Sequence, residues 1–145
     1  MNVTGQCLSG QYISGECLCG KIKYELKCAP QIMGICHCKN CQRQAGSAFS
    51  TVAAVPSSDF KFTAGEPRLY NDCDTDSGNT VKRYFCGHCG SPIYSAISSK
   101  PETLYLKTGT LDDTSGFSPQ FNVWCDSKQN WVELDENVPQ IAKQS

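Results

Sequence analysis

The 145-residue sequence has no apolar run approaching the roughly 20 residues that a membrane-spanning helix needs. Its first residues contain neither a basic start nor an apolar stretch, so we predict no secretory leader and expect a cytoplasmic protein without membrane contact. The formal net charge is only −1 at pH 7, which provides no basic field for binding nucleic acid. These absences favour a soluble globular protein.

Histidine is also scarce, since the chain has only His37 and His88. Each lies inside a cluster of cysteines, so a catalytic Cys–His pair of the hydrolase kind is a weak interpretation. The sequence shows no internal repeat and no long helical period, and we therefore expect little helix.

Short β-type segments fill most of the chain instead. Alternating apolar residues and runs of β-branched or aromatic residues predict strands at 21–26, 49–55, 59–62, 81–85, 92–97, 104–107, 121–124 and 131–134. One or two helical turns are predicted over 40–45, with Gly46 ending them. We predict a single mainly β domain over 15–138, with a flexible lead-in at 1–14 and a frayed tail at 139–145.

The most informative feature is the placement of the 11 cysteines. Seven of them form three clusters: Cys17/Cys19, Cys36/Cys38/Cys41 and Cys86/Cys89. Thiolates suit zinc, which takes four ligands in a structural site and keeps one position open in a catalytic site. Seven sulfurs divide into a closed set of four and an open set of three, so the sequence predicts two zinc ions with different roles.

The middle cluster supplies three sulfurs from six consecutive residues and is therefore the predicted open site. The outer two clusters would join into a closed site that ties together distant parts of the chain. Two alternatives remain: His37 completes a second structural site, or the cysteines form disulfides in a secreted domain, against which the odd count and the missing leader argue. We expect the other four cysteines not to be ligands: Cys7, Cys28, Cys73 and Cys125.

Several short motifs follow one another between Gly15 and Leu134. They are GECLCG at 15–20, CHCKNCQR at 36–43 followed by Gly46, FTAG at 62–65, RYFCGHCGS at 83–91, GTLDD at 109–113, and Lys128 with Trp131. In this order the chain resembles the glutathione-dependent formaldehyde-activating enzymes (the GFA domain) and their centromere-protein-V relatives over nearly its whole length.

The resemblance implies a β-tent fold of short antiparallel sheets with two zinc sites. It also implies that Cys17, Cys19, Cys86 and Cys89 hold a structural zinc, and that Cys36, Cys38 and Cys41 hold a catalytic zinc. The family's named activity joins glutathione to formaldehyde as S-hydroxymethylglutathione and is classed as a carbon–sulfur lyase. The chain departs from the pattern at Asn122, where many members carry histidine.

Two functions from different classes follow. The first is a zinc-dependent carbon–sulfur lyase whose open zinc position binds a substrate thiol such as glutathione. Glutathione carries two carboxylates, so we expect basic side chains to bind them. The candidates are Arg43 and Lys128, or Lys39. The alternative is a non-catalytic zinc-binding module that docks a protein partner, and a weaker third interpretation is redox sensing or zinc storage.

Overall fold

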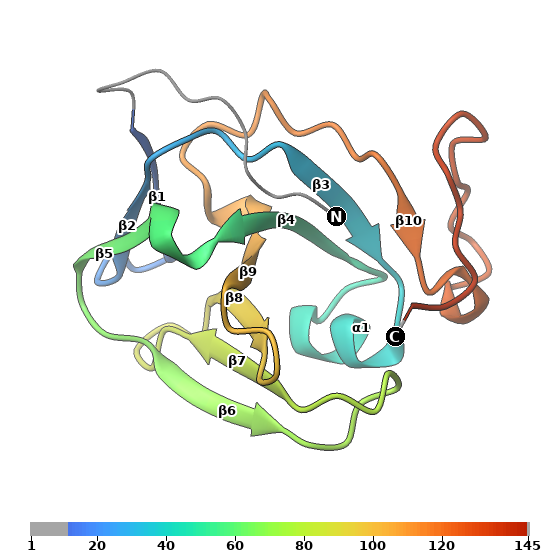
Figure 1. Cartoon of the computed structure of the whole chain (residues 1–145), viewed down its shortest axis with the longest axis horizontal. Coiled ribbons are helices and arrows are strands. Elements are labelled where there is room, and N and C mark those ends of the chain that lie inside the picture. The colour runs from blue at the N-terminus through green and yellow to red at the C-terminus, as the bar shows by residue number, and fades with distance from the viewer. Residues whose placement is uncertain (1–11, 145) are drawn as a thin grey trace.

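Two β-sheets build the protein, and the computed structural model describes residues 12–144. The smaller sheet has the strand order β1 (Ile13–Glu16), β2 (Lys23–Leu26), β5 (Phe60–Ala64), all antiparallel. The larger has seven strands in the order β10 (Asn122–Val123), β3 (Ile32–Cys36), β4 (Ser50–Pro56), β9 (Thr103–Lys107), β8 (Pro92–Ile97), β7 (Val81–Phe85), β6 (Arg68–Asp72). The predicted mainly β class with short antiparallel sheets is confirmed, and Figure 1 shows the smaller sheet on the left.

Helical structure is limited to short pieces. They are α1 (Lys39–Ala45) and three 3₁₀ turns, η1 (Ser57–Asp59), η2 (Thr108–Thr110) and η3 (Cys125–Ser127). The predicted turns at 40–45 are confirmed as α1, and Gly46 ends the helix in the left-handed conformation at φ 65°. Within residues 12–144, no helix has the length and apolar character needed to cross a membrane.

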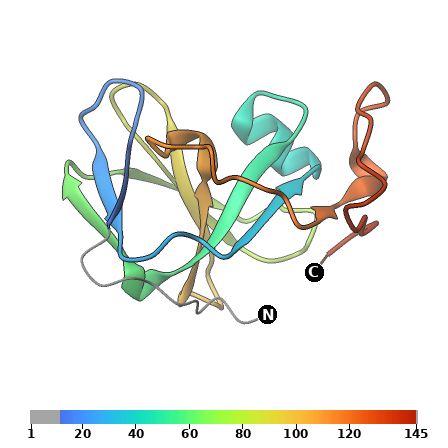
Figure 2. The same ribbon diagram turned by 90° about the horizontal axis from the view of Figure 1, so that it is seen from above.

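The hydrophobic core lies between the two sheets, which lean against each other (Figure 2). The smaller sheet contributes Tyr24 and Leu26, and the larger contributes Val55 and Leu106, all almost fully buried. In β9, Leu104 and Leu106 point to this core, so the alternate residues Tyr105 and Lys107 lie on the other face of the sheet. The larger sheet therefore has one apolar face that packs in the core and a second face on which polar side chains such as Lys107 lie.

The C-terminal region departs from the strand prediction. The segment 131–134 forms no strand, because only Val132 is buried and its N–H closes a turn with the carbonyl of Gln129. The strand expected at 121–124 shrinks to the two residues of β10, which pairs parallel with β3. In the tail after Val138, Ile141 donates its N–H to the carbonyl of Asn122, which places this segment against β10.

Candidate metal centres

The outer two cysteine clusters converge at one end of the sheets. Cys17 and Cys19 follow β1, whereas Cys86 and Cys89 lie in the turn between β7 and β8. Their four Sγ atoms lie within 4.8 Å of one another, with separations of 3.6 Å for Cys17–Cys19 and 3.8 Å for Cys19–Cys86. Four sulfurs about 2.3 Å from a tetrahedral zinc lie about 3.8 Å apart, so these spacings fit a structural zinc.

Backbone and hydroxyl groups complete the surroundings of these sulfurs. Cys17 Sγ accepts the N–H of Ile22 at 3.3 Å, and Cys86 Sγ accepts the N–H of His88 at 3.4 Å. N–H groups directed at sulfur favour the thiolate form that binds metal. His88 itself is exposed, so its ring does not join the cluster. The four-cysteine cluster joins the beginning of the smaller sheet to the β7–β8 turn of the larger one.

The middle cluster lies where β3 ends and α1 begins, and Figure 1 shows how the chain passes from this strand into the helix. Cys36 ends β3, Cys38 is the N-cap of α1, and Cys41 lies in the first turn of the helix. The three Sγ atoms lie within 4.8 Å of one another, and Cys38 Sγ accepts the N–H of Cys41 at 3.2 Å. A β-strand end followed at once by a capped helix therefore brings three sulfurs to one point.

His37 is not a fourth member of this group. Its side chain is fully buried, and Nε2 lies 2.9 Å from Oδ1 of Asn122 on the neighbouring strand β10. The ring also packs against Phe49, with centroids 5.5 Å apart. The alternative in which His37 closes a second structural site is therefore not supported. Asn122 therefore contacts the residue between Cys36 and Cys38, and the N–H of His37 donates to the carbonyl of the next residue of β10, Val123.

Two buried cations beside the three-cysteine cluster were missed by the sequence analysis. Lys107 is 7% exposed, and its Nζ donates to Ser50 Oγ at 2.7 Å. Ser50 lies directly opposite Cys36 in the β3–β4 ladder, so Lys107 shares a sheet face with that cysteine. Arg83 is 6% exposed and pairs with Asp72, with Nε 2.8 Å from Oδ2.

These cations affect the ionisation of the cluster. Contacts with Cys36 and Cys38 lower the pKa of Cys41, and the charges of Lys107 and Arg83 lower it further. The same sulfur contacts, together with burial, raise the pKa of Cys36. Burial lowers the pKa of Lys107, whereas the charge on Cys41 raises it. The crowding of the three sulfurs thus disfavours the ionisation of all three, and a bound cation would favour it.

A count of formal charges indicates how much is missing. Three thiolates carry three negative charges, Lys107 offsets one of them, and Arg83 and Asp72 cancel each other. Two negative charges remain, which is the charge that a divalent cation neutralises. Soft sulfur donors favour zinc among the common divalent ions, so the donor set and its surroundings fit the predicted metal.

The basic residues predicted to bind the substrate carboxylates are more exposed than Lys107 and Arg83. Arg43 is exposed on α1 and lines a shallow depression of about 340 Å³ with Gln42 and Gln129, and Lys39 borders the same depression. Lys128 follows η3, is half-buried and does not line this depression. Arg43 thus shares an element with Cys41, whereas Lys128 lies in the segment after η3, and a role of either in substrate binding stays a prediction.

The other described cysteines lie outside both clusters. Cys73 is exposed and Cys125 is half-buried in η3. Cys28 is disulfide-bonded, which the sequence analysis did not foresee. Cys7 falls outside the described residues.

The sequence profile described as "Glutathione-dependent formaldehyde-activating enzyme" (GFA) matches residues 12–127, a span that contains both clusters. The chain belongs to the GFA family. Relatives that carry the same family name include a Talaromyces marneffei protein, 28% identical over 116 residues, and a Colletotrichum graminicola protein, 33% identical over 96 residues. The resemblance seen in the sequence motifs is thereby confirmed.

The GFA relatives are longer than this chain. The two alignments cover 77% and 63% of the chain but only 60% and 48% of the relatives, so the chain spans about half their length. A crystal structure of a Rhodobacter sphaeroides protein is similar in fold, with a TM-score of 0.55 and 23% identity. That comparison covers 73% of the chain and 91% of the other protein.

Proposed function

We propose that the chain is a zinc-dependent enzyme that forms or cleaves the carbon–sulfur bond of a thiol–aldehyde adduct, with S-hydroxymethylglutathione as the substrate class. The observation that carries the proposal is the three-cysteine cluster, which offers only three ligands among the described residues and is flanked by buried cations. The GFA family is described as a glutathione-dependent formaldehyde-activating enzyme, and the matched residues 12–127 include this cluster.

The proposed reaction is balanced without any further reactant. The thiol sulfur forms a bond to the aldehyde carbon, the carbonyl π electrons move to oxygen, and the thiol proton ends on that oxygen. Zinc held by Cys36, Cys38 and Cys41 would lower the pKa of a bound thiol and so supply its thiolate form. The four-cysteine cluster would hold a second zinc whose role is structural.

Lys107 has a defined part in this scheme. Its positive charge and the zinc together neutralise the three cysteines, so an incoming thiolate meets a neutral site instead of an anionic one. Its bond to Ser50 holds the ammonium group on the sheet side of the cluster. Arg43, which is exposed on α1 and lines the depression beside it, and Lys128 are the candidate contacts for the glutathione carboxylates.

The test is the exchange between free formaldehyde and its glutathione adduct, followed by exchange NMR, which reports both directions at equilibrium. The zinc-loaded chain is expected to accelerate exchange by at least about tenfold over buffer and glutathione alone. Exchange no faster than in buffer would contradict the proposed function.

A lysine variant tests the role of the charge in the same assay. Lys107→Met keeps the apolar stem but leaves the site with excess negative charge, so KM for glutathione is expected to rise about tenfold. Lys61→Met, which removes an exposed lysine from β5, is the matched control and should leave KM unchanged. A rise of similar size in both variants would argue against a local role for Lys107.

A further inference from the structure

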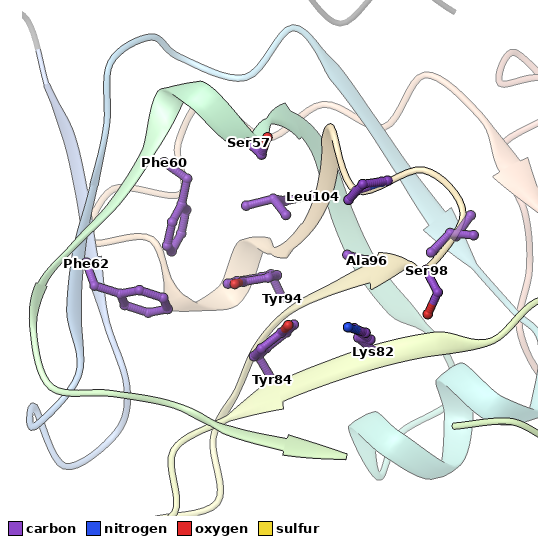
Figure 3. A pocket seen from close by; sticks show the side chains of 11 residues that line it. Ser57, Phe60, Phe62, Lys82, Tyr84, Tyr94, Ala96, Ser98 and Leu104 are labelled. Atoms are coloured by element: carbon purple, nitrogen blue, oxygen red, sulfur yellow. The ribbon is translucent and has the colours of Figure 1, made fainter. Parts of the chain in front are cut away.

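A second cavity lies on the other face of the large sheet, away from the cysteines that the proposed reaction uses. Its volume is about 380 Å³, and it opens between β5 and the strands β7 and β8 (Figure 3). In β7, Tyr84 faces this cavity, whereas its neighbour Arg83 faces the three-cysteine cluster. A ligand in the cavity would therefore be separated from the three-cysteine cluster by the sheet itself.

Four aromatic rings form the cavity wall. Tyr84 and Tyr94 are stacked across adjacent strands, with centroids 4.6 Å apart and planes inclined by 29°. Phe60 packs edge-on against Tyr94 at 5.1 Å and against Phe62 at 4.8 Å. Figure 3 shows these rings around one space, with the small side chain of Ala96 beside Tyr94. Such a wall provides flat apolar surfaces that suit a planar ring.

Three hydrogen-bond donors at the cavity have no partner within the part of the chain that the structure describes. Lys82 lines it beside Tyr84, and no carboxylate pairs with Lys82 within residues 12–144. The hydroxyls of Tyr84 and Tyr94 likewise have no hydrogen bond to any described residue. No aspartate or glutamate lines the cavity, so its charge complements an anion. Burial and the neighbouring Tyr84 raise the pKa of Tyr94 to about 12, which keeps its hydroxyl a donor at neutral pH.

We propose that this cavity is a binding site for a small planar aromatic anion, such as an aromatic carboxylate. The rings of Tyr84, Tyr94, Phe60 and Phe62 would enclose the apolar body, and Lys82 would bind the anionic group. The size is typical of small-ligand sites, and a few polar groups on an apolar wall are typical of their lining. The site is independent of the proposed lyase activity, since none of its residues belongs to either cysteine cluster.

The test uses naphthalene carboxylate and its neutral counterpart, naphthalene carboxamide, titrated into the zinc-loaded full chain by calorimetry. The carboxylate is expected to bind at least about tenfold more tightly than the carboxamide, because only the carboxylate forms a charge-assisted contact with Lys82. Lys82→Met should remove this difference while leaving carboxamide binding unchanged. Ala96→Phe should fill the cavity and abolish binding of both compounds.

Lys61→Met, on the exposed side of β5 and outside the cavity, is the matched control and should bind as the unmodified chain does. Thermal unfolding of Ala96→Phe distinguishes a filled cavity from a misfolded chain. The proposal is overturned if neither compound binds at millimolar concentration. It is also overturned if both bind equally, or if Lys82→Met leaves the preference for the carboxylate intact.

Discussion

Cys38→Ser is expected to lower the rate of formaldehyde–glutathione exchange by about a hundredfold or more while the protein remains folded. The side chain of Cys38 has two roles, because its sulfur belongs to the three-cysteine cluster and also accepts the N–H of Cys41 as the N-cap of α1. Serine is a strong N-cap, so the substitution keeps the helix start and removes only the soft metal ligand.

The control for this variant is Cys73→Ser, which changes an exposed cysteine outside both clusters and should leave the exchange rate unaltered. Cys38→Ala removes the ligand and the cap together, so it should lose activity and also unfold at a lower temperature. Zinc analysis should show one ion fewer in both Cys38 variants. If Cys38→Ser retained the full exchange rate, the zinc mechanism would be wrong.

Cys86→Ser is expected to act on stability instead, lowering the midpoint of thermal unfolding by more than about 10 °C. Cys86 is 2% exposed, and its sulfur lies 3.8 Å from that of Cys19, which belongs to the other sheet's first hairpin. A structural zinc binds with about 10–16 kcal/mol, comparable with the whole free energy of unfolding of a domain. Loss of one ligand at this junction therefore weakens the connection between the two sheets.

The matching control is again Cys73→Ser, which should shift the midpoint by no more than about 2 °C. Chelation of the unmodified chain should reproduce the effect of Cys86→Ser, since both remove the metal from the four-cysteine cluster. An unchanged midpoint after Cys86→Ser, measured with one zinc lost, would mean that this cluster does not support the fold.

The local sequence predicted the features that depend on neighbouring residues. Spacing grouped the seven clustered cysteines correctly into sets of four and three, because tight turns bring thiols two or three residues apart to one point. The helix at α1 followed from its polar residues and Gly46, whose left-handed conformation ends it. The alternating pattern at 131–134 wrongly predicted a strand, since Val132 is the one buried residue of this segment.

The charges around the three-cysteine cluster could not be predicted in the same way. Lys107 follows Leu104, Tyr105 and Leu106 in a half-buried strand, and a lysine in that pattern is normally solvated. Only the register of β9 against β4 places it opposite Val52 and within reach of Ser50, on the face that the cysteines share. The buried pair of Arg83 and Asp72 depends on the β6–β7 pairing in the same way.

The pairing of His37 with Asn122 shows how tertiary structure decided one alternative. The sequence left His37 open as a possible fourth ligand, although its position between Cys36 and Cys38 favours a side chain that points away from their shared ion. The parallel pairing of β10 with β3 supplies Asn122 as the partner of the imidazole, 85 residues away in the chain. The same contact places the departure from the family pattern, Asn122, next to the residue that lies between Cys36 and Cys38.

X-ray absorption at the zinc edge, recorded before and after glutathione is added, tests the central claim most directly. One closed and one open site predict an average of about 3.5 sulfurs per zinc in the free protein, with a lighter ligand completing the set. Glutathione should raise the average to about 4 by adding its sulfur at the three-cysteine cluster. Four sulfurs at every zinc before glutathione is added, as in a non-catalytic zinc module, or an average that glutathione leaves unchanged, would contradict the account.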